Sequence, residues 1–394
     1  MQKKQQRNYG IGEGRNLNVL NYDIKYKERK SDVSASINII QKAMVSLREK
    51  MFGCIAGVHI GSSMGAVVEG MKWQEIEDKY GYVDKLYPYE HYWNGWMREA
   101  GTTEDGVERQ KLMITAIGEK KNRVTAEDIR AIWLRDIKDK VGGWVSEPFE
   151  DTLLAMARTG IPATDLGRYC DYAGLNSFAR ACHPIGLINA GDIQAAKEDI
   201  LQCGQLYQTA NSKGLKWACV TGIAIAEATK PDATVDSVLG AIYDHCDKDL
   251  VVKEIDEQLS YTRDCRTIQE MRSKFDSVYS GEGMPYPFSY ANEVVTKGIC
   301  IFKMTAGNTK EAILAGVNMG RDTDCVAAVA AGIAGALTGG ESIPEEWIKQ
   351  VDYATTQNPY TNSKRTLREN SDMIYNAYMS RLEAMEEQIK HMKY

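Results

Sequence analysis

The sequence lacks several features that mark special classes of protein. Its 394 residues carry a net charge of −6, which argues against a general nucleic-acid-binding protein, whose domains are usually basic. No apolar run approaches the roughly 20 residues that cross a bilayer. The N-terminus, MQKKQQRNYGIGEG, lacks the apolar core of a signal peptide. We therefore expect no nucleic acid and no membrane among the partners, and a cytoplasmic location.

The cysteines also form no recognisable framework. There are nine, they are scattered, and no two have the CxxC spacing typical of zinc or redox sites. Six of them stand among apolar neighbours, which favours reduced, buried thiols over disulfides or zinc ligands. These six are Cys54, Cys170, Cys182, Cys203, Cys219 and Cys300.

Strand signals are nearly absent, because there is little period-2 alternation and no Asn-Gly hairpin. Helical periodicity dominates instead, so we predict an all-α fold. Residues 1–31 are polar and aperiodic and are interpreted as a loosely ordered arm. No Pro/Gly/Ser linker divides the remainder, so residues 32–394 are predicted to form a single large helical bundle.

Apolar residues at alternating steps of three and four predict helices along most of this domain. The first should begin near Ser34 or Ser36 and end in a Gly/Ser-rich turn before Glu69. The last predicted helix, over 371–394, is amphipathic and could dimerise or pack back on its own domain. Further helices are predicted over 103–121, 125–141, 147–159, 162–174, 190–207, 214–230, 234–246, 289–305, 308–320, 322–338 and 371–394.

The segment that follows Asp322 contains almost no bulky side chains. Residues 327–336 read AAVAAGIAGA. Each glycine inside a helix costs about 1 kcal/mol relative to alanine, so such a composition requires compensation. Small residues allow neighbouring helices to approach closely. We therefore predict that this is the central helix of the bundle, surrounded on all sides.

Asp322 and Asp324 stand at the start of this helix, next to Gly320. One interpretation is capping, because carboxylates are favourable at the positive end of a helix dipole. A second is metal binding, because two hard oxygen donors at i and i+2, with Thr323 between them, suit Mg²⁺. The two interpretations remain open on this segment alone.

Two further acidic segments each allow a structural and a functional interpretation. Thr103, Glu104 and Asp105 could cap a helix, or they could offer a hydroxyl and two carboxylates to a metal. Glu69 lies between Val68 and Gly70. It could face solvent at a helix end, or it could be partly buried with a raised pKa suited to general acid/base catalysis.

Taken in order, four stretches resemble the ADP-ribosylglycohydrolase family over roughly residues 50–350. They are GCIAGVHIGSSMGAVVEG (53–70), TTEDG (102–106), FARACHPIGLINAGD (178–192) and NMGRDTDCVAAVAAGIAGALTGGESIPEEW (318–347). The resemblance implies an all-α hydrolase that cleaves a ribosyl N- or O-glycosidic bond in an ADP-ribosylated protein or small molecule. Alternatives are an unusual N-riboside or nucleoside-like substrate, or a non-catalytic relative that binds ADP-ribose or serves structurally.

The resemblance also implies two Mg²⁺ ions, replaced by Mn²⁺ in some members. The matching metal ligands are Thr103, Glu104, Asp105, Asp322 and Asp324, with Asp324 bridging the ions. Glu69 and Asp105 match the catalytic positions. The substrate loop falls on Asn176, Ser177 and Phe178, where the aromatic ring could stack on a flat group.

The sequence departs from the family pattern at several of these positions. Glu104 replaces an aspartate, Ser62 another aspartate, and Cys325 a hydroxyl ligand, so the second metal site is expected to be weakened. Arg321 replaces a glycine and could grip an anionic substrate group. A histidine often found in the family corresponds to Gln208, Thr209 or Asn211. Residues 87–101 are rich in aromatics and could form a lid or simply pack locally. The oligomeric state is not indicated.

Overall fold

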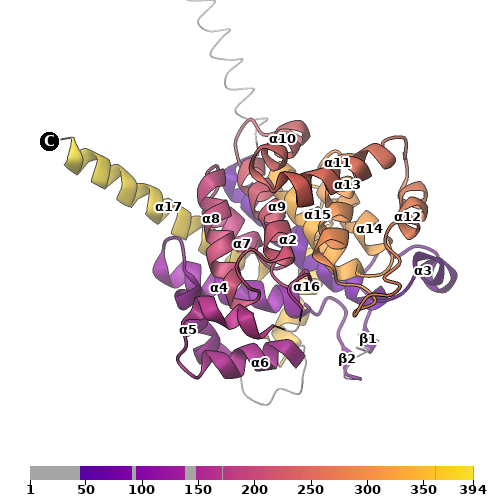
Figure 1. Cartoon of the computed structure of the whole chain (residues 1–394), viewed down its shortest axis with the longest axis horizontal. Helices are drawn as coiled ribbons and strands as arrows, with labels where there is room; N and C mark the ends of the chain where they lie inside the picture. Colours follow the sequence, from indigo (N-terminus) through magenta and orange to yellow (C-terminus); the bar gives the residue numbers. More distant parts are fainter. Residues whose placement is uncertain (1–44, 91–94, 138–147, 171, 360, 394) are drawn as a thin grey trace, which may run out of the picture. The chain divides into compact units, whose positions relative to one another are not determined.

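The computed structural model describes residues 45–90, 95–137, 148–170, 172–359 and 361–393 (Figure 1). The prediction of an all-α fold is confirmed. The first helices are α2 (Leu47–Gly65), α3 (Trp73–Tyr80), α4 (Asp105–Lys120), α5 (Ala126–Asp136), α6 (Pro148–Ala157), α7 (His183–Ile188), α8 (Ile193–Cys203) and α9 (Lys213–Ala228). They are followed by α10 (Val235–His245), α11 (Lys253–Tyr261), α12 (Ile268–Asp276), α13 (Ala291–Met304), α14 (Thr309–Val317), α15 (Thr323–Thr338), α16 (Glu345–Gln357) and α17 (Leu367–Met392).

Strands are confined, in the described residues, to one short antiparallel pair. It joins β1 (Tyr89–Glu90) to β2 (Met97–Arg98), with Tyr89 opposite Arg98. Short helical turns fill several connections: η1 (Ala66–Val68), η2 (Ala163–Tyr169), η3 (Gly204–Leu206) and η4 (Lys248–Val252). The helix predicted over 162–174 is therefore the 3₁₀ turn η2. Helices α3, α7, α11, α12 and α16 were not predicted.

Helix α15 lies at the centre of the packed helices, as its composition predicts. It packs against α2, α9, α13 and α14 (Figure 1). Every residue from Thr323 to Leu337 is buried. The prediction of a surrounded central helix is confirmed.

A stripe of glycines on α2 explains how close this packing is. Gly53, Gly57, Gly61 and Gly65 recur at every fourth residue and so lie on one face of the helix. A Cβ atom on Gly53 would lie 2.2 Å from the Gly339 carbonyl carbon, and one on Gly65 would lie 2.6 Å from the Asp324 Cα. The two backbones are therefore in direct contact.

This stripe corrects the predicted Gly/Ser-rich turn. Residues 61–65 continue α2 as regular helix, and Glu69 follows the short turn η1. The glycines were interpreted as helix breakers, whereas in the structure they provide room for α15. Ser62 is buried inside α2. The part of the predicted helix before residue 45 lies outside the described residues, as does the predicted arm over 1–31.

The same region contradicts the expectation that no apolar run is long enough to cross a membrane. Leu47–Val68 is long and apolar enough to cross a membrane, yet the whole apolar window is buried within the protein. Its contacts with α15, α14 and α17 show that it is a core helix.

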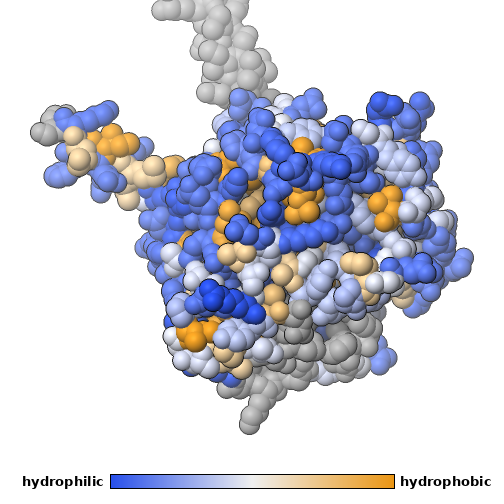
Figure 2. All heavy atoms as spheres, viewed as in Figure 1, coloured by the Kyte–Doolittle hydropathy of each residue, from blue (hydrophilic) through white to orange (hydrophobic). Residues whose placement is uncertain are grey.

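All nine cysteines are free thiols. Five of the six predicted to be buried are buried, and Cys170 is partly exposed. The last helix, α17, packs with its first half on α2, α4 and α7. Residues 383–393 of its second half are exposed, and Met385, Ile389 and Met392 leave apolar side chains there (Figure 2).

Candidate metal centre

A tight backbone junction brings the segment after Glu69 to the segment before Asp322. Gly320 and Arg321 both have positive φ, +83° and +67°. The Gly70 N–H donates to the Arg321 carbonyl at 2.8 Å, and the Arg321 N–H donates to the Met71 carbonyl at 2.7 Å. A Cβ on Gly320 would lie 2.6 Å from the Trp73 nitrogen, so this position requires glycine.

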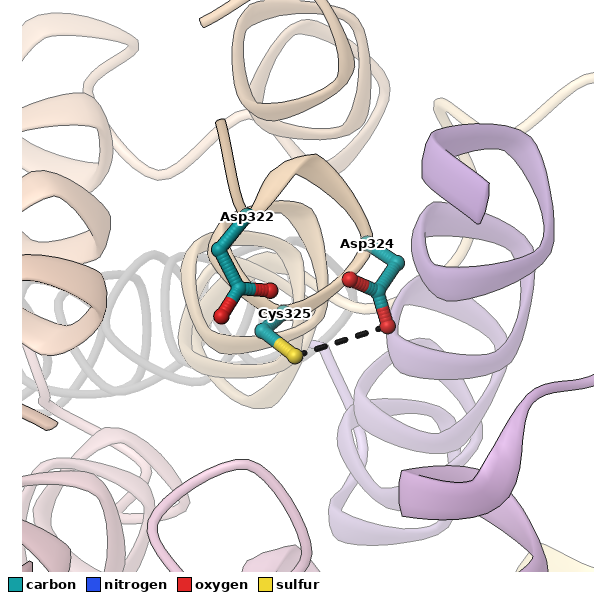
Figure 3. Close-up of side chains that lie close together, drawn as sticks. All are labelled: Asp322, Asp324 and Cys325. Carbon is teal, nitrogen blue, oxygen red and sulfur yellow. Dashed lines mark hydrogen bonds between the residues drawn. The ribbon is translucent and has the colours of Figure 1, made fainter. Parts of the chain in front are cut away.

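Asp322, Asp324 and Cys325 form what we call the α15 edge of the site. Their candidate ligand atoms lie within 4.8 Å of one another (Figure 3). The Asn176 amide donates to Asp322 Oδ2 at 2.9 Å, and the Cys325 thiol donates to Asp324 Oδ2 at 3.4 Å. Oδ1 of Asp322 and Oδ1 of Asp324 are buried and accept no hydrogen bond within the described part of the chain.

These unpartnered oxygens favour metal binding over capping at the α15 edge. Asp322 is at the N-cap position, but its side chain makes no capping hydrogen bond. A buried carboxylate oxygen without a partner is costly unless a cation or water reaches it. The α15 edge therefore fits a hard divalent cation bound through Asp322 and Asp324. Burial and the two neighbouring carboxylates raise the pKa of the Cys325 thiol, so it stays protonated and is a poor ligand.

Glu104 and Asp105 form the α4 edge, and arginines accompany both. The Glu104 carboxylate accepts hydrogen bonds from the Tyr89 hydroxyl and the Arg98 guanidinium. Asp105 Oδ2 accepts from Arg109 at 3.1 Å and from Arg180 at 2.5 Å. The predicted lid or packing segment, residues 87–101, thus reaches the site through Tyr89 and Arg98.

The two edges belong to one site. Arg180 donates to Asp105 and also, at 3.4 Å, to the Cys325 sulfur. Burial, followed by the negative charges of Asp105 and Asp324, raises the pKa of Glu104 well above its ordinary value. Acidic residues more than 200 positions apart in the sequence therefore share one electrostatic environment.

Glu69 completes this environment from the end of η1. Its pKa is raised well above the ordinary value, first by desolvation and then by the charges of Asp322, Glu104 and Asp105. The pKa of Asp324 is raised by burial and by Glu69. Carboxyls that repel one another in this way hold their protons to a higher pH than isolated carboxyls do.

Thr103 is placed differently from the other predicted ligands. Its hydroxyl donates to Glu108 at 2.9 Å and accepts from Lys111 at 3.0 Å, in a buried network that also contains Thr361. These contacts engage the hydroxyl within the protein. Its predicted role as a metal ligand stays a prediction that requires this network to rearrange.

The predicted substrate-binding residues also differ in whether they contact the site. Asn176 contacts the α15 edge, and the Ser177 carbonyl accepts from Arg109 at 3.0 Å. The Phe178 ring is fully buried and stacks on Tyr207, with centroids 5.2 Å apart, so it does not face a ligand.

Arg321 makes a bidentate ion pair with Glu293, at 2.6 and 2.9 Å. That pair engages its guanidinium within the protein, so its predicted grip on a substrate anion remains untested. Gln208, at one of the positions compared with the family histidine, donates to the carbonyls of Ala173 and Leu175 and so supports the loop before Asn176.

Sequence reasoning missed Arg98, Arg109 and Arg180. A signal existed for Arg180, because an arginine flanked by Ala179 and Ala181 in an apolar segment requires a buried anionic partner. Arg98 and Arg109 lie close to Glu104 and Asp105 in the sequence, but nothing in their spacing shows which way they point.

Comparisons with known proteins identify the family of this chain. Residues 43–382 match the family model described as ADP-ribosylglycohydrolase, a longer range than the four motifs indicate. A Rhodospirillum rubrum protein, ADP-ribosyl-[dinitrogen reductase] glycohydrolase, is 23% identical over 310 residues, covering 78% of this chain and 92% of the relative.

A solved structure described as an ADP-ribosylglycohydrolase-related protein complex superposes with a TM-score of 0.59 at 16% identity. It covers 85% of this chain and 98% of the other, and supports the fold. The chain belongs to the ADP-ribosylglycohydrolase family and is a hydrolase of that type.

Proposed function

We propose that this protein is a divalent-cation-dependent hydrolase of ribosyl N- or O-glycosidic bonds, with ADP-ribosyl groups on protein side chains as the first substrate class. The observation that carries the proposal is the pair of buried, unpartnered oxygens, Asp322 Oδ1 and Asp324 Oδ1, in a site shared with Glu69 and Asp105. The name of the Rhodospirillum rubrum relative, which refers to an ADP-ribosylated protein, supports the substrate class.

In the reaction, the oxygen of a water molecule bonds to the anomeric carbon. The bond from that carbon to the leaving nitrogen or oxygen breaks, and the leaving atom keeps the electron pair. The transition state has oxocarbenium character. A Mg²⁺ or Mn²⁺ ion held by Asp322 and Asp324 would orient hydroxyls and lower the pKa of a water molecule beside it.

The protein's own residues handle the protons and the positioning. Glu69, with its raised pKa, is suited to hold the proton that the leaving group accepts. Asp105, fixed by Arg109 and Arg180, is suited to orient the attacking water and to accept the proton that this water loses. Asn176 holds Asp322 through its amide.

The test is a panel of substrates assayed for released ADP-ribose or ribose. The panel contains an ADP-ribosylated protein, ADP-ribosylated small molecules, and simple N-ribosides and nucleosides. We expect release from an ADP-ribosylated substrate, its loss after chelation, and its return with Mg²⁺ or Mn²⁺. Release from N-ribosides alone would shift the proposal to that class. ADP-ribose binding without turnover of any substrate would show a non-catalytic relative.

A further inference from the structure

Two of the positions at which this chain departs from the family's metal-binding pattern share a feature. Glu104 accepts a hydrogen bond from the Arg98 guanidinium, and Cys325 accepts one from Arg180. At two of the departures that weaken the predicted ligand set, an arginine thus donates a hydrogen bond to the replacing side chain.

Arg180 is held firmly in this position. Its backbone N–H donates to the Asn176 carbonyl at 3.1 Å, and its own carbonyl accepts from Gln110 at 3.1 Å. Gly106 leaves room for its side chain, because a Cβ there would lie only 3.2 Å from the Arg180 Cδ. The residue is 6% exposed, so its charge requires the Asp105 carboxylate as a partner.

The charges on the two edges are arranged differently. The α4 edge accepts hydrogen bonds from three guanidinium groups, those of Arg98, Arg109 and Arg180. The hydrogen-bond donors to the Asp322 and Asp324 carboxylates are neutral, namely the Asn176 amide and the Cys325 thiol. Guanidinium groups therefore hydrogen-bond directly to the carboxylates of the α4 edge, whereas on the α15 edge the hydrogen bond from Arg180 goes to the Cys325 sulfur.

We propose that the site binds a single divalent cation, on Asp322 and Asp324, and that the Arg180 guanidinium takes the place of a second cation beside Asp105. This inference rests on the proposed function, and it replaces the two-ion expectation with one ion plus one fixed organic charge. A guanidinium stays protonated at any working pH, so chelators remove the charge of the cation and leave the charge of Arg180 in the site.

The number of bound ions tests this directly. The full-length protein is freed of metal by chelation, dialysed against increasing Mn²⁺, and analysed by elemental mass spectrometry and electron paramagnetic resonance. We expect one Mn²⁺ per chain at saturation, with the spectrum of an isolated ion. Two ions per chain with a spin-coupled spectrum would overturn the inference while leaving the proposed hydrolysis intact.

The variant that tests Arg180 is Arg180→Met, which keeps an apolar stem and removes the charge. We expect it to bind a second Mn²⁺ and to develop a spin-coupled spectrum, whereas Arg180→Lys should still bind one. Arg272→Met is the matched control, because Arg272 is equally buried but pairs with Glu77. It should also bind one ion.

Other results of these Mn²⁺-binding experiments would also decide parts of the inference. If Arg180→Met folds, as judged by circular dichroism, and still binds one ion, Arg180 does not occupy a cation position. If it does not fold, the single-ion stoichiometry of the unaltered protein and of Arg180→Lys still decides the first half of the inference. Binding of no Mn²⁺ at millimolar concentration would overturn both this inference and the cation dependence of the proposed function.

Discussion

The α15 edge and the α4 edge present the same chemical groups under opposite conditions. Asp322 and Asp324 are buried at a helix N-terminus, and each retains an oxygen without a partner. Glu104 and Asp105 also stand at a helix N-terminus, but guanidinium groups contact both. The carboxylates of the two edges thus differ in their partners, and within the described residues the α15 edge is the one that leaves buried carboxylate oxygens for an external cation.

The strongest way to break this comparison is to neutralise a carboxylate on the α15 edge. Asp324→Asn keeps the shape of the side chain and removes its charge. We expect turnover and Mn²⁺ affinity to fall by more than about 100-fold, because even residues that only support ligands contribute 10–100-fold. Asp372→Asn is the control, since Asp372 pairs with Arg48 on the surface. Unchanged Mn²⁺ uptake by Asp324→Asn would show that this edge does not bind the ion.

The corresponding change on the α4 edge should act on stability instead. Glu104→Gln leaves the buried Arg98 guanidinium without its carboxylate. The free energy of unfolding should fall by about 3 kcal/mol, the usual cost of breaking a buried ion pair. Mn²⁺ affinity should remain close to that of the unaltered protein. Denaturant titration and Mn²⁺ titration measure the two quantities, and a large loss of Mn²⁺ affinity would contradict the difference between the edges.

The α15 edge also depends on its contact with α2. In Gly65→Ala, the added Cβ would lie 2.6 Å from the backbone of Asp324, so α15 must move. Overpacking of this kind costs about 1–3 kcal/mol of stability. Gly240→Ala on α10 is the matched control, because no atom lies within 4 Å of the added Cβ.

The control should gain roughly 0.5–1 kcal/mol, since alanine favours helix over glycine. Thermal unfolding of the two variants should therefore shift in opposite directions. Equal shifts would mean that the glycine stripe does not set the distance between α2 and α15.

The smallest effect concerns pH. Burial and repulsion by Glu69 raise the pKa of the proposed ligand Asp324 well above its ordinary value, so this carboxyl holds its proton to a higher pH than an ordinary aspartate when no cation is bound. Cation binding must release this proton, and Mn²⁺ affinity should therefore keep rising with pH above the range in which ordinary carboxylates titrate. The rise should be up to about tenfold per pH unit for each proton released.

Ordinary carboxylates would give an affinity that levels off above about pH 5. Titration between pH 5.5 and 8.5 separates the two cases. Glu69→Gln should flatten the profile, because Glu69 is one of the carboxyls that raise the pKa of Asp324.

How much the sequence can predict depends on which contacts are local. Helical periodicity and the small residues of 327–336 predict the fold class and the central helix, because both are properties of a continuous segment. The glycines of α2 were misread for the opposite reason. Gly61 and Gly65 look like a turn in isolation, and their function appears only when Ala327 and Asp324 lie against them.

The site shows the same limit. Spacing and resemblance single out Asp105, Asp322 and Asp324, and the structure brings them together. The arginine contacts of the α4 edge, and the burial of Phe178 against Tyr207, depend on the direction of side chains from separate elements. No pattern along one segment contains that information.

The most direct measurement is anomalous diffraction from crystals of the full chain soaked in Mn²⁺. We predict one strong peak in contact with Asp322 and Asp324, and the Arg180 guanidinium still bonded to Asp105. Two peaks bridged by Asp324, with Arg180 displaced, or no peak at a saturating concentration, would contradict the difference between the two edges.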